Sequence, residues 1–325
     1  MAVYTKPHLS YSAQMDLLVR RGLRVRDSAN AQHLLSEIGY YRLSGYWYPY
    51  RLPADPVRRD TFQPGTTLDQ VVALYDFDRQ LKLLILDAVE RVEIAMRVRV
   101  GHTLGKRDAH AHLDARHLDP QFSKTRLGGH ESGHDQWLER VLNEQKRSKE
   151  DFVQHFKDRY DDRLPIWVIT EIMDFGSLSH LYKGSLRADR DAIALELAIC
   201  DARGDGNGLA LTNWLQVINH LRNVCAHHSR LWNRNMTVQI APRHLRDISA
   251  LDHIGAPGPA HDRVYSALCV LVYLMRQVVP TSGWRTRLQG LLVTGLAPTG
   301  RTASEMGFPD DWTTQPLWNW APDAG

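Results

Sequence analysis

A short run near residue 222 combines three side chains that suit acid–base chemistry on a phosphate. Arg222 is followed directly by Asn223, and His227 comes four residues after the asparagine. Histidine titrates near neutral pH and can take or deliver a proton. A guanidinium holds phosphate oxygens and stabilises the charge that grows on them. Because the 2′-hydroxyl of RNA can supply the nucleophile, this set predicts RNA cleavage without a metal or other cofactor, leaving a 2′,3′-cyclic phosphate and a 5′-hydroxyl.

The same run has the pattern of an amphipathic helix over residues 213–228. Asn223 and His227 are four apart and share one face of such a helix, and the long Arg222 side chain can reach the same space. His228 is turned by about 100° from His227 and is expected to point elsewhere. The opposite face carries an apolar stripe that is expected to be buried. The stripe consists of Trp214, Val217, Ile218, Leu221 and Val224 or Cys225.

The spacing of the arginine and the histidine is not diagnostic by itself. The same spacing of five occurs at Arg97 and His102 and at Arg107 and His112, and Arg246 precedes His253 by seven. Arg222 differs because a polar asparagine follows it and because the opposite face of its helix is apolar. The competing explanation is an ordinary solvated helix end.

Apolar residues at helical spacing dominate the chain, which predicts a mainly α-helical fold. A helix is expected to start at Thr67, where Thr67 and Gln70 form a capping box, and another to end at Gly39, which suits a left-handed cap. One short segment, 236–240, alternates like a strand. The remaining helices are expected at residues 12–22, 28–38, 135–158, 166–183, 187–201, 213–226, 260–279 and 284–293.

The helical patterns divide the chain into three parts. Residues 1–65 form a small N-terminal helical and aromatic module, residues 66–293 a larger bundle, and residues 294–325 a proline-containing tail. Polar residues rich in histidine and glycine predict an irregular insertion at 103–134, within the bundle. A glycine-rich turn at 202–208 directly precedes the helix that carries Arg222.

The composition fits a globular protein with a polyanionic partner but does not require one. The net charge is only +3 and the isoelectric point is near 8.7. Arginine supplies 32 of the 40 basic residues, and guanidinium groups match phosphate geometry well; a GC-rich genome explains the same bias. Three cysteines give no disulfide framework and fit a reducing compartment. With neither a leader pattern nor a long apolar run, we expect a cytoplasmic protein with no membrane partner.

An aromatic and arginine-rich block near the N-terminus offers a second surface for RNA. Aromatic rings stack on unpaired bases, and guanidinium groups hold phosphates. Two structural explanations stay open, namely rings packed as a core and arginines on a solvated helix face. The residues expected to contact RNA here are Arg20, Arg21, Arg42, Arg51, Tyr46 and Tyr48.

Histidines in the insertion raise the alternative of a metal site. A zinc site needs a small set of converging ligands with an ordered surrounding shell, which a histidine-rich loop often lacks, so we expect no metal. Glu90, Glu93 and Glu171 are expected to pair with an arginine near the site or in ordinary structural ion pairs. The histidines in question are His102, His110, His112, His117, His130 and His134.

Several sequence blocks resemble the Abi-like family of abortive-infection proteins, of the AbiD and AbiF type. They occur in the family's order along most of the chain. Among them are Ile-Gly-Tyr-Tyr-Arg-Leu-Ser-Gly-Tyr-Trp at 38–47 and Pro-Ile-Trp-Val-Ile-Thr-Glu at 165–171. The blocks lie at residues 38–50, 74–81, 90–96, 164–176, 221–228 and 306–312.

This family is placed in the HEPN superfamily of helical ribonucleases. The resemblance implies that Arg222, Asn223 and His227 occupy the positions of the superfamily's catalytic motif. Such sites usually combine two motifs, and one is present here, which implies a homodimer. Some relatives of the AbiF type are encoded beside structured noncoding RNAs, so the resemblance implies an RNA antitoxin as an expected partner. The resemblance therefore predicts an endoribonuclease of an abortive-infection or toxin–antitoxin system. The alternative is a non-catalytic module that binds RNA or nucleotides and acts by sequestration.

Overall fold

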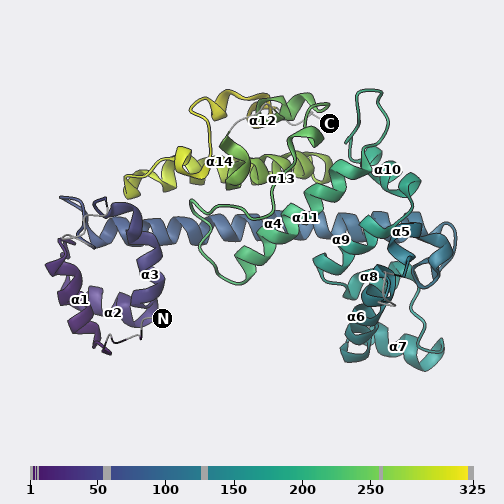
Figure 1. Ribbon diagram of the computed structural model, residues 1–325, viewed down its shortest axis with the longest axis horizontal. Helices are drawn as coiled ribbons and strands as arrows, with labels where there is room; N and C mark the ends of the chain where they lie inside the picture. Colours follow the sequence, from purple (N-terminus) through teal and green to yellow (C-terminus); the bar gives the residue numbers. More distant parts are fainter. Residues whose placement is uncertain are drawn as a thin grey trace. The chain divides into compact units, whose positions relative to one another are not determined.

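The structure is a computed structural model that describes residues 3, 5, 7–53, 60–125, 131–255 and 259–320. These residues are mainly α-helical (Figure 1) and contain isolated β-bridges but no strand. The predicted fold class is therefore confirmed. The chain divides into two compact units, the first made of residues 1–83 and 286–305 and the second of residues 84–285 and 306–325.

The first unit packs short helices around aromatic side chains. Trp47 is fully buried, with its ring centroid 4.9 Å from that of Tyr40 and 6.3 Å from that of Phe62. The Tyr50 hydroxyl donates to the Thr299 carbonyl at 2.7 Å and so ties the 286–305 segment to this unit. The helices are α1 (Tyr11–Arg20), α2 (Ser28–Glu37), α3 (Tyr40–Trp47) and the beginning of α4 (Leu68–Gly105).

The predicted start of α4 is confirmed by its hydrogen bonds. The Thr67 amide donates to Gln70 Oε1 at 2.9 Å, and the Gln70 amide donates to Thr67 Oγ1 at 3.2 Å, which is the capping box at the start of α4. The helix α2 ends at Glu37, close to the predicted end at Gly39. The predicted left-handed cap is wrong, because Gly39 has φ of +87° with ψ of 142°, outside the left-handed helical region, and leads directly into α3.

The second unit is built around two adjacent helices, α11 and α13. All side chains from Val264 to Met275 in α13 are buried, as in a helix that is apolar on every side. The Trp214 ring of α11 meets the Tyr273 ring of α13 edge to face at 5.7 Å. The principal helices are α6 (Gly133–Arg147), α7 (Asp151–Arg159), α8 (Ile166–Ile172), α9 (Phe175–Gly184), α10 (Arg187–Glu196), α11 (Gly208–Ala226) and α13 (Val264–Val278).

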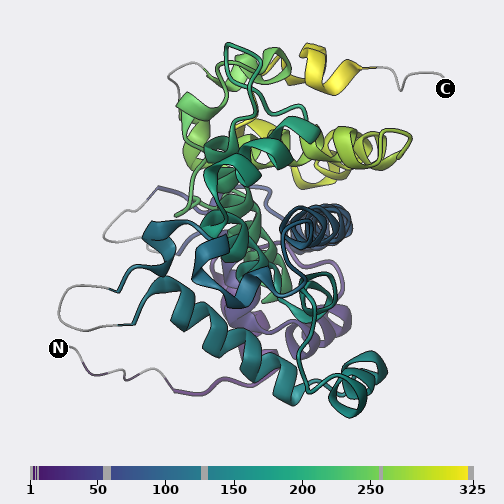
Figure 2. The same cartoon turned by 90° about the vertical axis from the view of Figure 1, so that its right-hand side faces the viewer.

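Shorter elements complete the unit, and Figure 2 views it nearly along α4. The expected insertion at 103–134 contains brief helical turns, and its residues 126–130 lie outside the described ranges. The segment Trp284–Gly290 (α14) starts at the end of the second unit and continues, as part of the first unit, into a single π-helical turn, Leu291–Gly295. The remaining short helices are α5 (Pro120–Ser123), α12 (Asp252–Gly255) and α15 (Pro316–Asn319).

Two segments predicted as single helices are each broken into two. In place of one helix at 166–183, α8 ends at Ile172 and Asp174 starts α9, because its carboxylate accepts the Ser177 amide at 2.6 Å. In place of one helix at 135–158, the backbone is extended at Ser148 and at Glu150, so α7 starts anew. At α9 a polar side chain that caps the helix therefore overrides the apolar periodicity. At α7 the Glu150 amide donates to Ser148 Oγ at 3.3 Å, and Glu150 makes no side-chain cap bond.

The strand predicted at 236–240 is wrong. This segment lies against α11 as irregular chain, because its polar groups find partners other than a strand. The Asn213 side chain of α11 donates to the Gln239 carbonyl at 3.2 Å and accepts the Ala241 amide at 3.0 Å. Met236 and Ile240 are buried, which accounts for the alternating pattern without a sheet.

In the described parts of the chain, no helix combines the length and the apolar character that a membrane crossing requires. The proposed parts 1–65, 66–293 and 294–325 stay a prediction.

Candidate active site

The first turn of α11 is anchored against α10. Asn207 caps the helix by accepting the Ala210 amide, and the Gly208 amide donates to Asp191 Oδ1 at 3.0 Å. A Cβ at Gly208 would lie 2.6 Å from Arg190 Cβ, so only glycine permits this close approach. The helix that carries Arg222 therefore starts from a fixed position.

The last turn of α11 ends in a Schellman motif. His227 is the C-cap residue, and its amide donates to the Asn223 carbonyl at 3.0 Å. His228 follows with φ of +54°, and its amide donates to the Cys225 carbonyl. The Ser229 amide then bonds to the Val224 carbonyl at 3.0 Å. His228 is thus outside the helix, which corrects the prediction that placed it on the helical wheel.

The three predicted catalytic residues lie together at this exposed end of the helix. Arg222 Nη1 donates to Asn223 Oδ1 at 3.3 Å, and both side chains are partly buried. The His227 ring is exposed to solvent. All the stripe residues named as buried from the sequence are buried, with at most 5% of their surface exposed. The amphipathic character predicted for this helix is therefore confirmed.

Arg222 also borders a polar hollow of about 340 Å³ between α11 and α4. Arg222 comes from α11, and α4 supplies the rest of the wall in successive turns. The hollow contains two arginines and two glutamates, together with apolar side chains. Its lining consists of Leu86, Val89, Glu90, Glu93, Ile94, Arg97 and Arg222.

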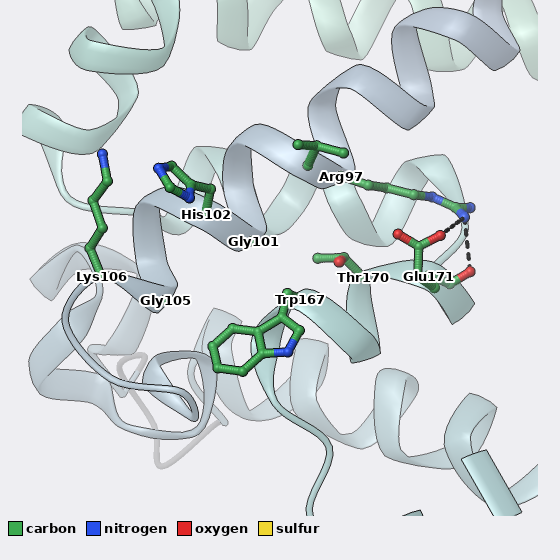
Figure 3. A pocket seen from close by; sticks show the side chains of 9 residues that line it. Arg97, Gly101, His102, Gly105, Lys106, Trp167, Thr170 and Glu171 are labelled. Carbon is green, nitrogen blue, oxygen red and sulfur yellow. Dashed lines mark hydrogen bonds and ion pairs between the residues drawn. The ribbon is translucent and has the colours of Figure 1, made fainter. Parts of the chain in front are cut away.

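Arg97 is held in place on one side of this hollow. Its guanidinium pairs with Glu93 at 2.6 Å. It also pairs with Glu171 at 3.6 Å, a contact drawn in Figure 3. It also donates to the carbonyls of Glu171 and Met173, each at 2.8 Å, at the break between α8 and α9. Glu93 and Glu171 thus pair with an arginine beside the site, as predicted, and the partner is Arg97 and not Arg222. The sequence offered one clue, the spacing of four between Glu93 and Arg97.

The N-terminal residues expected to contact RNA divide into buried and exposed sets. Tyr46 is only 1% exposed, and its hydroxyl donates to the buried Asp78 carboxylate at 2.7 Å. Because that ring has no open face, Tyr46 is not available for stacking on RNA, contrary to expectation. Tyr48 is 67% exposed, and Arg20 and Arg42 are also exposed, so an RNA contact at these three stays a prediction.

Arg21 and Arg51 are engaged with one carboxylate. Asp60 pairs with Arg21 at 3.1 Å and with Arg51 at 2.5 Å. Arg21 also donates to the Tyr40 hydroxyl at 2.8 Å, and the Arg51 guanidinium lies 5.7 Å from the centre of the Tyr48 ring. These two arginines form ion pairs within the first unit. An RNA contact at Arg21 and Arg51 stays a prediction.

Part of the histidine-rich insertion forms a packed cluster. His134 Nε2 bonds to the His112 carbonyl at 2.8 Å, and the His134 ring stacks near Trp137. Burial lowers the pKa of His112 to about 3, so this ring stays neutral. Among the residues that the structure describes, no group of three or more His, Cys, Asp or Glu side chains is placed to hold a metal. His130 lies outside them.

The family model described as "Abi-like protein" matches residues 33–233, which is more than half of the chain. This chain belongs to the Abi-like family. The matched span includes the Gly39 turn, α4 and all of α11, and hence Arg222, Asn223 and His227. No curated protein and no solved structure is found to match this Abi-like protein. Membership indicates a role in abortive infection, a defence against phage.

Proposed function

We propose that this Abi-like protein is a metal-independent endoribonuclease of the HEPN type that acts in phage defence, with Arg222 and His227 as its catalytic pair. The observation that carries the proposal is the end of α11. One face of that helix is fully buried. The other brings an arginine, an asparagine and an exposed histidine to the last turn, beside a hollow between two helices.

The chemistry needs one proton removed and one delivered. As the RNA 2′-oxygen attacks the phosphorus, a base takes the 2′-hydroxyl proton, and the bond from phosphorus to the 5′-oxygen breaks as an acid protonates that oxygen. His227 is suited to either role. Arg222 would stabilise the charge on the non-bridging oxygens, and Asn223 would orient Arg222 through their hydrogen bond.

One histidine cannot be base and acid in the same step, so we expect a homodimer with the two α11 ends facing each other across a two-fold axis. Light scattering on the eluted protein should give about twice the 37.2 kDa of the chain. Mixing wild-type protein with an excess of Arg222→Ala protein should lower the cleavage activity per wild-type chain, because most wild-type chains then form mixed dimers. A monomeric mass under conditions that support cleavage would contradict this assembly.

Cleavage should persist in EDTA and should leave 2′,3′-cyclic phosphate and 5′-hydroxyl ends, because the nucleophile belongs to the RNA. Incubation of the purified protein with total RNA, followed by sequencing that depends on the end chemistry, tests both points. Activity that is lost on chelation and restored by zinc or magnesium would instead indicate a metal-assisted reaction.

The alternative function, a module that binds RNA or nucleotides without cutting, makes a different prediction for the same residues. Sequestration should survive Arg222→Ala or His227→Ala, provided that binding is unchanged. Growth arrest in cells that express such a variant, together with intact RNA, would favour sequestration over cleavage.

A further inference from the structure

One tryptophan of the chain is exposed on the surface while the others are not. Trp167 in α8 has 51% of its surface exposed. Seven of the nine tryptophans are buried, and Trp320 is intermediate. Since an exposed indole is costly in water, its surroundings need a specific explanation.

Two glycines of α4 allow Trp167 to pack closely against this helix, Gly101 at the Trp167 backbone and Gly105 at one edge of the indole. A Cβ on Gly101 would lie 3.2 Å from Trp167 Cα, and a Cβ on Gly105 would lie 3.0 Å from Trp167 Cε3. Larger residues at these positions would push α8 away. The indole therefore projects from α8 directly beneath this turn of α4 (Figure 3). The contact with Gly105 covers one edge of the indole and leaves about half of the Trp167 surface exposed.

The indole lines a concavity of about 500 Å³ that also contains cations. Lys106 and His102 are exposed on the same turns of α4, whereas Thr170 is buried at its base. The size is that of a small-ligand pocket, mainly apolar with a few polar groups. Its lining consists of Arg97, Val98, Gly101, His102, Gly105, Lys106, Trp167, Thr170 and Glu171.

This concavity adjoins the hollow at Arg222. Arg97 lines both, and Gly105 follows it by eight residues, about 12 Å along the helix. Between them α4 exposes Val98, whose surface is 60% exposed. A chain bound at Arg222 can therefore continue along one face of α4 to the indole.

We propose that Trp167 is a stacking platform for one unpaired base of the RNA substrate, with Lys106 holding a neighbouring phosphate. The inference rests on the proposed nuclease function and specifies its substrate as single-stranded RNA, since a paired base offers no free face. Proteins bind unpaired strands with exposed aromatic rings and cations that line one groove. Trp167 and Lys106 line the same concavity, and the Lys106 amine extends away from the indole (Figure 3). A second copy of this chain packed on the same indole is the competing outcome.

Binding can be measured without cleavage by using His227→Ala protein and a fluorescently labelled, unstructured RNA oligonucleotide. Trp167→Ala should weaken binding about 5- to 150-fold, the effect of losing one stacked base, and Trp167→Phe should retain part of the affinity. Lys106→Ala should weaken binding and reduce its salt dependence. Matched controls are Tyr160→Ala, an exposed aromatic with 56% of its surface exposed, and Lys149→Ala, an exposed lysine; both should bind normally.

Tryptophan emission gives an independent readout, because Trp167 is the exposed indole. Unlabelled RNA should quench part of the emission of His227→Ala protein, and Trp167→Phe should remove that quenching while the remaining binding persists. Quenching that persists in Trp167→Phe, or affinity unaltered in Trp167→Ala with native circular dichroism, would overturn the proposal. A third outcome would also overturn it: Trp167→Ala protein that becomes monomeric while its affinity for RNA is unchanged. That result would assign the indole to the contact between two copies of the chain.

In the otherwise wild-type protein, Trp167→Ala should raise KM for a single-stranded RNA and leave kcat within a few-fold, because the base is held equally before and during reaction. A perfectly paired duplex should be a poor substrate for both proteins. If no variant cleaves RNA while RNA binding still depends on Trp167, the nuclease function fails and the stacking site stands. If cleavage is normal in Trp167→Ala at limiting RNA, the stacking site fails and the nuclease stands.

Discussion

Replacing His227 with alanine is expected to reduce RNA cleavage by about 10²–10⁴-fold, the usual effect of removing a proton-transfer group. Arg222→Ala should reduce the rate of RNA cleavage by about 10²–10³-fold, because the phosphate oxygens lose the hydrogen-bond donor that stabilises their negative charge. Cleavage of a labelled oligonucleotide in single-turnover reactions measures both, and growth of cells that express each variant should recover in parallel. Asn223→Ala should fall between wild type and these variants, because it orients Arg222 through a 3.3 Å hydrogen bond.

Both variants should remain folded. The His227 ring is exposed and Arg222 is only partly buried, and substitutions away from a packed core usually change the free energy of unfolding by less than about 0.5 kcal/mol. The matched control is His228→Gly, which removes the neighbouring imidazole and suits the φ of +54° at that position. Loss of cleavage in His228→Gly with full cleavage in His227→Ala would move the catalytic role to His228. Full activity in all three would remove the HEPN mechanism.

Asp78→Ala is expected to lower the free energy of unfolding of the first unit by about 3–5 kcal/mol, the cost of breaking a buried ion pair. Asp78 is fully buried and accepts the Tyr46 hydroxyl at 2.7 Å. Lys82, one helical turn later, pairs with the same carboxylate oxygen at 3.0 Å. Burial and the neighbouring carboxylate raise the pKa of Tyr46, so its hydroxyl stays a donor at neutral pH. Removing Asp78 leaves a buried ammonium and a buried hydroxyl without this acceptor.

Urea unfolding followed by circular dichroism measures this loss. Asp76→Ala is the matched control on the same helix, because Asp76 pairs with Arg79 at 3.6 Å and both side chains are about half exposed. A surface pair of that kind contributes less than about 1 kcal/mol. Equal destabilisation by the two substitutions would show that burial does not set the strength of the Asp78 pair.

The sequence by itself determined which segments are helical and which face of the Arg222 helix is buried. Both follow from local rules, because apolar residues every three or four positions must turn to a core whatever lies opposite. The Thr67 and Gln70 capping box is equally local. The three candidate catalytic residues were also accessible, because they lie within six residues of one another on one helix end.

Only the tertiary structure decided what surrounds those residues. The hollow at Arg222 forms because α4, which carries Arg97, lies beside α11, although the two helices are more than 100 residues apart in the sequence. Apolar periodicity does not specify which helices meet. The burial of Tyr46 depends on Asp78 in the same way. The break before α9 places the Glu171 and Met173 carbonyls where Arg97 binds them. Trp167 became a candidate only beside Gly101 and Gly105. Distant segments come into contact only where their backbones can approach closely. Which segments do so depends on how the volumes and charges of all side chains fit together in the packed core.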